Sequence, residues 1–357
     1  MTGLSGLTDA LIAISPEGQA AIVGLIAGLM LGAAARLVDF CTLSALETAL
    51  LGRDYRRIHI WGLALGTAIL GTHLAEALGL IRIADSVHHL IVWNPLGSII
   101  VGLVFGYGMA LAGNCGFGAL IRAGGGDIRS VVIVAVLGIS AYFTFAGPLG
   151  PLRNRLFPQE MQDGPSGIAH DLSAISGLPA PLFAVVIGVG LIALGLRHPA
   201  IRQSRATILG AAVVGLSVVV AFVGTTLVAD YSLGAVPMEG PSFTAPVGRT
   251  ILYLMTSTGT MPSFSVGLVG GTFAGAFLAS QWRRNFYWEA CDDPHELGRQ
   301  LGGAVLMGIG GVVALGCTIG LGLSASATLA WAGPTTLAAI SVGTYAGLLH
   351  LVAGNDA

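Results

Sequence analysis

Residues 96–126 read LGSIIVGLVFGYGMALAGNCGFGALIRAGGG, an apolar run followed by a glycine-rich break that holds a cysteine. The run at 96–113 carries no charged residue, and about 20 apolar residues are enough for a helix to cross a bilayer. The apolar piece at 117–123 is too short to cross. Irregular backbone at membrane depth survives only where protein or a polar cavity surrounds it. The stretch therefore predicts a membrane helix followed by a short re-entrant helix.

The composition extends this reading to the whole chain of 357 residues. It is 54% hydrophobic and only 10% charged, where a soluble domain carries about 25% charged residues. The 54 glycines favour closely packed membrane helices. We expect an all-α polytopic membrane protein with nine spans, near 20–38, 59–80, 96–113, 128–146, 180–197, 206–229, 263–281, 299–315 and 334–352. Shorter apolar pieces near 42–51, 117–123, 248–258 and 319–330 are predicted to be re-entrant.

We expect one membrane domain over residues 1–357. Its first half runs over about 20–147 and its second half over about 180–352. The stretch 148–179 is the most polar part of the chain and is rich in proline, so it is predicted to be a loop between the halves.

The arginines set the expected orientation, because cytoplasmic loops carry an excess of positive charge. With the first span running inward, eleven arginines lie in predicted cytoplasmic loops and four on the opposite side. The expected protein is a multi-pass membrane protein with its N-terminus outside and its C-terminus in the cytoplasm. The eleven are Arg53, Arg56, Arg57, Arg122, Arg129, Arg197, Arg202, Arg205, Arg283, Arg284 and Arg299, and the four are Arg82, Arg153, Arg155 and Arg249.

Two internal matches indicate a repeat. Glycines in G-x-x-x-G spacing recur by chance in a glycine-rich chain, but a cysteine at the same offset makes chance much less probable. The two cysteine units enter the membrane from opposite faces, as in transporters built from inverted repeats. The first match pairs Gly106, Gly108, Cys115 and Gly118 with Gly308, Gly310, Cys317 and Gly320; the second pairs Gly24, Gly28 and Gly32 with Gly267, Gly271 and Gly275.

Three cysteines share one context, and we call Cys41, Cys115 and Cys317 the motif cysteines. Each follows an apolar helix and a break and precedes a short helix, whose N–H groups and positive dipole end would point at the thiol. Such a place attracts an anion, and the nearby cations Arg36, Arg122 and Arg129 have the matching charge. The alternative is that each cysteine is a small buried hydrophobe. The loop residues predicted to line a path beside the thiols are Gly113, Asn114, Gly116, Gly118, Gly316, Thr318 and Gly320.

The energetics favour weak donors over fixed charge along such a path. Moving an ion from water into a dry interior costs on the order of 20 kcal/mol in the idealised limit, so donors must accompany a permeant anion. A buried arginine at the centre would hold the anion too tightly, whereas conduction needs sites that release it. Neutral S–H and backbone N–H groups suit a soft, sulfur-bearing anion that must keep moving.

The segments GNCGFGALIRAGGGDIRS (113–130), ALGCTIGLGLSASATL (314–329) and DFCTLSALETALLGRD (39–54) resemble the three cysteine motifs of the YeeE/YedE family. The resemblance spans nearly the whole chain. It implies an hourglass of nine spans with four central buried loops and pseudo-symmetric repeats. It also implies import of thiosulfate or a related sulfur-containing anion across the bacterial inner membrane past the motif cysteines, with a small TusA-like sulfurtransferase as a soluble partner. We expect no cofactor, no metal and no catalytic residue.

Two other function classes are open at this point. A membrane sulfurtransferase or thiol-redox enzyme would need a resolving thiol or a base near its nucleophile, and the sequence has no C-x-x-C pair. A less selective anion channel would carry the thiols without using them. Cys291 lies in the polar stretch FYWEACDDPHELGR, where zinc-ligand spacing is absent, and is predicted to be in a solvated loop.

Overall fold

The computed structural model describes residues 15–162, 166–290 and 294–355, and its regular elements in those ranges are helices. Seven of the described helices are long and apolar enough to cross a membrane. These confirm an all-α polytopic membrane protein. The bounds are α2 Pro16–Val38, α3 Thr42–Leu50, α4 Arg56–Ala77, η1 Ile83–Asp85, α5 Val87–Leu90, α6 Pro95–Ala112, α7 Gly116–Gly124, α8 Ile128–Phe145, α9 Gly150–Leu156, α10 Ile168–Ser176, α11 Ala180–Leu196, α12 Pro199–Arg202, α13 Arg205–Tyr231, α14 Ala245–Thr256, α15 Phe264–Trp282, α16 Pro294–Val313, η2 Gly320–Ala325 and α17 Ala332–Asn355.

A long helix lies at each of the nine predicted places. Two of these nine helices are not among the seven that are long and apolar enough to cross a membrane. Helix α11 is apolar throughout but has 17 residues. Helix α16 has 20 residues and carries Glu296 and Arg299 in its first two turns. The number of nine crossings therefore stays a prediction.

Side-chain caps fix where several long helices begin. The Ser15 hydroxyl accepts a hydrogen bond from the Gly18 N–H at 3.3 Å, with Pro16 as the first residue of α2. Helix α6 begins in the same way, since Asn94 Oδ1 accepts from the Gly97 N–H at 3.0 Å. A polar cap satisfies one of the N–H groups that the first turn of a helix leaves unpaired.

The glycines of the second repeat match form the contact between α2 and α15. A Cβ atom on Gly28 would lie 2.4 Å from the carbonyl oxygen of Leu268, and one on Gly271 would lie 2.3 Å from that of Leu25. The two backbones therefore touch directly, and a larger residue at these positions would force the helices apart.

The first repeat match also appears as paired helix contacts. Gly106 in α6 lies against the Ile340 carbonyl in α17, and Gly308 in α16 lies against the Leu137 carbonyl in α8. Helix α6 thus packs on α17 where α16 packs on α8, as expected when α6 and α16 are equivalent elements of a repeat.

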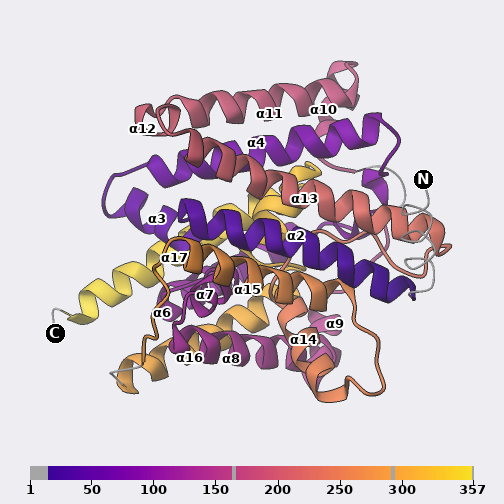
Figure 1. Cartoon of the computed structure of the whole chain (residues 1–357). Helices are drawn as coiled ribbons and strands as arrows, with labels where there is room; N and C mark the ends of the chain where they lie inside the picture. Colours follow the sequence, from indigo (N-terminus) through magenta and orange to yellow (C-terminus); the bar gives the residue numbers. More distant parts are fainter. Residues whose placement is uncertain (1–14, 163–165, 291–293, 356–357) are drawn as a thin grey trace, which may run out of the picture.

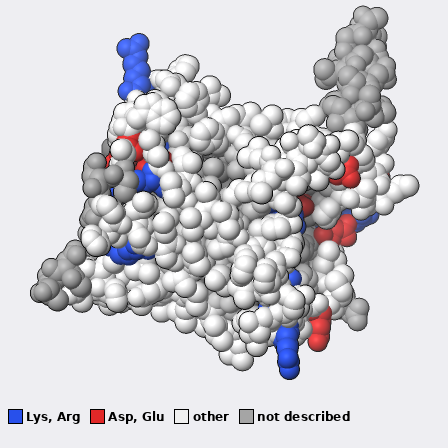
Figure 2. All heavy atoms as spheres, turned by 90° about the horizontal axis from the view of Figure 1, so that it is seen from below, with Lys and Arg blue, Asp and Glu red and all other residues white. Residues whose placement is uncertain are grey.

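The long helices run side by side in Figure 1, with α11 and α4 at the top and α8 and α16 at the bottom. We call the end where α2 and α6 finish the Arg122 face, and the opposite end, where they begin, the Arg249 face. Charged side chains in Figure 2 gather toward the two ends and leave a mostly uncharged band between them. A bilayer core would cover such a band.

Two predicted features differ in detail, and a third cannot be compared. The stretch 148–179, predicted to be a loop, contains the short helices α9 and α10. The piece near 319–330 contains a π-helical segment, η2. The π-helix is rare in proteins, and many of its occurrences are at functional sites. Cys291 lies outside the described residues.

Candidate functional site

The breaks before the motif cysteines share one backbone geometry. Two residues before each thiol the chain adopts a left-handed conformation, which ends the preceding helix. Only one of the three positions is a glycine, the residue that adopts this conformation without steric cost. The three left-handed residues are Asp39 (φ 52°), Gly113 (φ 70°) and Leu315 (φ 63°).

The thiols of Cys115 and Cys317 lie at helix starts and accept hydrogen bonds from backbone N–H groups. The Cys115 sulfur accepts from the Gly118 N–H at 3.2 Å. The Cys317 sulfur accepts from the Gly320 N–H at 3.5 Å and from the Phe243 N–H at 3.3 Å. Because sulfur is the acceptor in each bond, the S–H hydrogen is left to donate to a ligand.

Cys41 is the N-cap of α3 and lies close to Cys115. A Cβ atom placed on Gly118 would be 3.5 Å from both sulfurs and 3.4 Å from Asn114 Oδ1. The absence of a side chain at Gly118 therefore keeps a gap between the two thiols and the Asn114 amide.

A cavity of about 250 Å³ leads from the Arg122 face to this gap. Its wall includes Cys41, Asn114 and Gly118 together with Arg36 and Arg122. The Arg36 Nε donates to Ser280 Oγ at 2.9 Å. In the part of the chain that the structure describes, no carboxylate lies within salt-bridge distance of Arg122. Its guanidinium is exposed and lines this cavity, which we call the Arg122 cavity.

A cavity of about 350 Å³ lies toward the Arg249 face, and we call it the Arg249 cavity. Its inner end is formed by Gly316, Gly320 and Ser242, and the Ser242 hydroxyl lies 3.9 Å from the Cys317 sulfur. The wall also carries charge, from Arg249 and Glu239. Burial raises the pKa of the Glu239 carboxyl above its usual range, and the guanidinium of Arg249 opposes the rise.

A barrier of buried residues lies between the inner ends of the two cavities. Cys115 is 0% exposed and Cys317 is 1% exposed, and Thr318 beside Cys115 is fully buried. The rings of Phe117 and Phe243 contact each other with centroids 4.9 Å apart. The structure is therefore closed at its centre, with one motif cysteine on each side of a paired aromatic contact.

Several buried polar atoms around the barrier lack hydrogen-bond partners among the described residues. They include Asn114 Oδ1 and the hydroxyls of Thr42 and Thr244. An unpaired buried polar group costs about 1–3 kcal/mol, and a bound ligand could satisfy the groups that lie here. These hydroxyls and the thiols are neutral donors.

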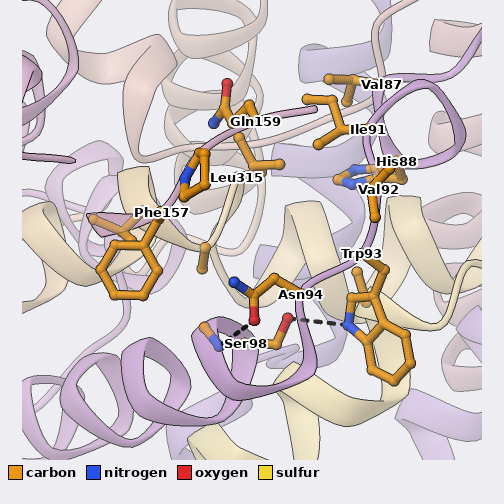
Figure 3. Close-up of a pocket in the computed structure, with 15 residues that line it drawn as sticks. Val87, His88, Ile91, Val92, Trp93, Asn94, Ser98, Phe157, Gln159 and Leu315 are labelled. Carbon is orange, nitrogen blue, oxygen red and sulfur yellow. Dashed lines mark hydrogen bonds between the residues drawn. The ribbon is translucent and has the colours of Figure 1, made fainter. Parts of the chain in front are cut away.

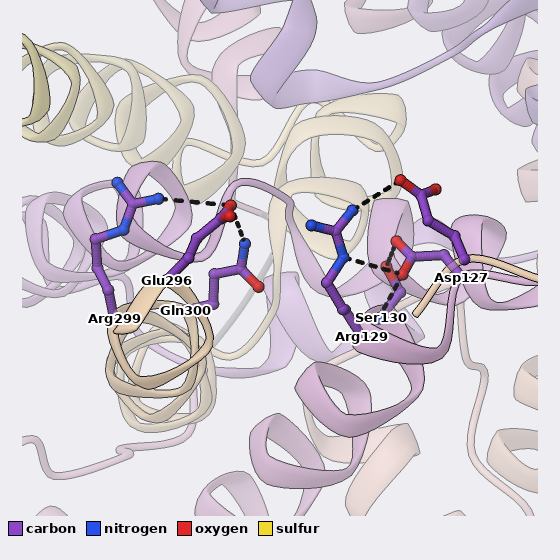
Figure 4. A network of polar contacts seen from close by, with 7 residues as sticks. Asp127, Arg129, Ser130, Glu296, Arg299 and Gln300 are labelled. Carbon is purple, nitrogen blue, oxygen red and sulfur yellow. Dashed lines mark hydrogen bonds and ion pairs between the residues drawn. The ribbon is translucent and has the colours of Figure 1, made fainter. Parts of the chain in front are cut away.

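The structure brings most of the predicted residues together, but they do not all have the same role. Gly116 packs against Leu137 and Gly316 against Leu321, so these two glycines permit close packing. Arg129, predicted only as a nearby cation, is already bound: its Nη2 lies 3.0 Å from Glu289 and its Nε lies 3.6 Å from Asp127 (Figure 4).

Sequence reasoning predicted a short segment near 248–258 but missed the loop before it, residues 240–244, because that loop contains no cysteine and no glycine pair. Its signal was the Gly240-Pro241 dipeptide, which is typical of loops, and the Phe243 N–H of this loop donates to Cys317. The Glu239 and Arg249 pair was also missed, since the two residues are ten apart and join only through the fold.

A smaller pocket of about 60 Å³ adjoins the Arg249 cavity and shares His88 and Gln159 with it (Figure 3). Trp93 and Asn94 line it, and the Trp93 indole N–H donates to the Ser98 hydroxyl at 3.1 Å. Burial lowers the pKa of His88 to about 4. His88 is therefore neutral at neutral pH and adds no charge to either space.

Comparison with known proteins identifies relatives over most of the chain. Residues 38–346 match a family described as sulphur transport. The chain is 26% identical over 335 residues to the thiosulfate transporter TsuA of Escherichia coli (strain K12), covering 90% of this chain and 92% of that protein. It is 28% identical over 314 residues to the thiosulfate transporter TsuA of Spirochaeta thermophila, covering 83% of this chain and 88% of that protein.

Proposed function

The chain belongs to the sulphur transport family, and from this membership we propose that it imports thiosulfate or a closely related sulfur-containing anion. The membership confirms the family resemblance that the cysteine motifs predict. Two relatives aligned over most of their length are named thiosulfate transporters, and that name supports a transporter rather than an enzyme.

We propose that the anion passes Cys317, Cys115 and Cys41 in turn. The observation that carries this proposal is that two cavities from opposite faces end beside motif cysteines, with buried residues between them. On this proposal the contact between the Phe117 and Phe243 rings opens when the anion passes.

Each part of this path has a distinct electrostatic task. Arginines at the cavity mouths raise the local anion concentration, because a charged cleft with low-dielectric walls concentrates its counter-ion. Thiols, hydroxyls and backbone N–H groups replace hydration water at the centre. Arg122, exposed and without a described carboxylate partner, is the proposed attracting residue on the Arg122 face.

The arginine distribution supports an orientation in which the Arg122 face is cytoplasmic. On this proposal the C-terminus is cytoplasmic, the segment 148–179 is external and the membrane is the bacterial inner membrane. A small TusA-like sulfurtransferase is the proposed soluble acceptor at the cytoplasmic face. A phosphatase reporter fused after Ala357 is expected to be inactive and one inserted within 148–179 active. The reverse pattern would contradict the orientation and leave the family membership intact.

The function is tested with the purified protein in liposomes. We expect uptake of radiolabelled thiosulfate that leaves the ion unchanged, with little uptake of radiolabelled chloride. Equal chloride uptake would favour a less selective channel. A persulfide or disulfide left on the chain after turnover would favour a thiol enzyme, and no uptake of either ion would contradict the proposal.

A further inference from the structure

We propose that Glu239 and Arg249 form a proton-linked capture site in the Arg249 cavity: the anion replaces the Glu239 carboxylate on Arg249, and Glu239 takes up one proton. This inference rests on the proposed function, since it assigns a coupling proton to the same transport path. The bonds that change are one ion pair broken, one ion pair formed and one O–H bond formed with a proton from the solution that fills the cavity.

The pair faces the cavity that ends beside Cys317. The Arg249 Nη1 lies 3.8 Å from Glu239 Oε1, a loose contact at the outer limit of an ion pair. The two side chains are 39% and 27% exposed, so both are reachable from the cavity. A second oxyanion can therefore approach Arg249 without displacing any other protein group.

Arg249 is held in place by contacts that do not involve Glu239. Its guanidinium lies 5.1 Å from the centroid of the Phe145 ring, and that of Arg153 lies 5.5 Å from the same centroid. The Arg249 Nη1 also donates to the Ser265 hydroxyl at 3.5 Å. These contacts keep the guanidinium positioned while its carboxylate partner is exchanged for an anion.

Glu239 is held by its backbone, which leaves its carboxylate free to change partner. Its N–H donates to the Thr225 hydroxyl at 3.1 Å, and the same hydroxyl lies 3.3 Å from its carbonyl oxygen. The charged and titratable groups that share the cavity with it are Arg249, Arg153, His88 and Asp85. Of these, Arg249 is the cation within ion-pair distance.

The charge on Glu239 depends on whether its carboxylate or an anion is paired with Arg249. Burial raises the pKa of the Glu239 carboxyl, and the Arg249 guanidinium that faces it opposes this rise. Once an anion occupies Arg249, the carboxylate faces both a nearby negative charge and burial, and both favour the protonated form. Anion binding thus raises the proton affinity of Glu239. By reciprocity, protonation raises anion affinity.

The sign of the pH effect follows from that linkage. Affinity for the anion is expected to rise as pH falls, and to stop rising once Glu239 is already protonated in the empty protein. Where Glu239 is ionised when empty and protonated when loaded, the linkage of one proton changes affinity about tenfold per pH unit.

The first test uses the unmodified protein. Thiosulfate is added to purified protein in weakly buffered detergent solution, and a pH indicator follows the bulk pH. We expect the solution to become more alkaline by up to one proton per bound anion over a series of starting pH values from about 5 to about 8, because burial raises the pKa of Glu239 above the ordinary value of a glutamate. Binding measured by calorimetry with no proton change in that range would overturn the proposal and leave thiosulfate transport standing.

The second test compares Glu239→Gln with Asp85→Asn. Asp85 lines the same cavity, but its carboxylate lies 2.7 Å from Arg82 and does not face Arg249. Glu239→Gln is expected to bind thiosulfate without proton uptake and with affinity that no longer depends on pH. Asp85→Asn is expected to keep the pH dependence of the unmodified protein.

Two outcomes separate this inference from the proposed function. If thiosulfate binding to Glu239→Gln still depends on pH, the proton belongs to another group. This outcome overturns the inference and leaves the proposed function standing. Failure of the unmodified protein to bind thiosulfate overturns both. Should Glu239→Gln not accumulate in the membrane, Arg249→Gln serves instead, and it is expected to lower thiosulfate affinity at every pH and to abolish proton uptake.

Discussion

The Cys115 unit, formed by α6 and α7, and the Cys317 unit, formed by α16 and η2, have the same glycine and cysteine spacing but different local structures. In the first, the chain turns through Gly113 and continues as a regular helix whose N-terminus the thiol caps. In the second, it turns through Leu315 and continues as a π-helical segment. The Cys317 sulfur also binds the Phe243 N–H of a separate loop.

The difference shows that the shared spacing fixes where a thiol lies and the neighbouring loop fixes how it is held. The Cys115 thiol accepts its backbone hydrogen bond from within its own unit. The Cys317 thiol depends on residues 240–244, which come from another part of the chain. We therefore expect the two units to respond alike when a thiol is removed and differently when the backbone around it is crowded.

Removal of a thiol is expected to have the largest effect, and a similar one in both units. Cys115→Ala and Cys317→Ala each remove one donor from a serial path, and Cys41→Ala removes a third. Losing a donor to a charged partner costs about 1.5–3 kcal/mol, which lowers the rate about ten- to a hundredfold if that step limits transport. Initial thiosulfate uptake at matched membrane levels measures this.

Two controls accompany the alanine variants. Cys291→Ala is expected to leave uptake unchanged, because no sequence feature places Cys291 on the path. Serine at each motif position keeps a donor of similar size but binds its own surroundings more strongly, so partial rescue is expected. Wild-type uptake in all three motif variants would refute the thiol path and leave the family membership untouched.

A methyl group at the matched positions Gly118 and Gly320 is expected to separate the two units. At Gly118 the methyl carbon would lie 3.4–3.5 Å from Asn114 Oδ1 and the two sulfurs, which is ordinary contact. At Gly320 it would lie 3.0 Å from the Ser242 Cβ and closer still to its hydroxyl. The first substitution fills the gap between thiols, whereas the second pushes on the central loop.

Gly118→Ala is therefore expected to lower uptake about tenfold with little loss of thermal stability. Gly320→Ala is expected to destabilise the protein by about 1–3 kcal/mol, the usual cost of overpacking. Uptake in liposomes and thermal unfolding in detergent measure the two effects. Equal stability losses in both variants would mean that the units are held in the same way.

The repeat and the membrane fold could be predicted because they depend on local patterns. Apolar runs locate the long helices, and a cysteine at equal offsets locates two of the central breaks. The glycine stripes of α2 and α15 were visible as spacing, although their direct contact, such as Gly28 on the Leu268 carbonyl, required the fold. The short helices α3 and α7 could also be predicted, because the breaks in the apolar pattern define where they end.

The rest depended on contacts between residues far apart in sequence. The Phe117 and Phe243 barrier joins two loops, and neither phenylalanine carries a pattern that predicts the other. Glu239 and Arg249 come from a loop and from α14. The left-handed residues at Asp39 and Leu315 were not predicted either, because leucine and aspartate give no turn signal comparable to Gly113.

The smallest expected effect concerns the left-handed positions before the motif cysteines. These positions share a backbone conformation and differ in side chain. Gly113 has no atom within 4 Å of its Cβ position, so Gly113→Ala adds backbone strain without a clash. That strain is expected to cost about 1–2 kcal/mol. Asp39→Gly is the reverse change at the equivalent position, and it is expected to stabilise by up to about 1 kcal/mol, less the entropy that glycine adds to the unfolded chain. Thermal unfolding of both variants in one detergent measures the difference. If Gly113→Ala is as stable as the unmodified protein, the left-handed turn before Cys115 is absent in solution, and the backbone likeness of the breaks is lost even where the thiols still act alike.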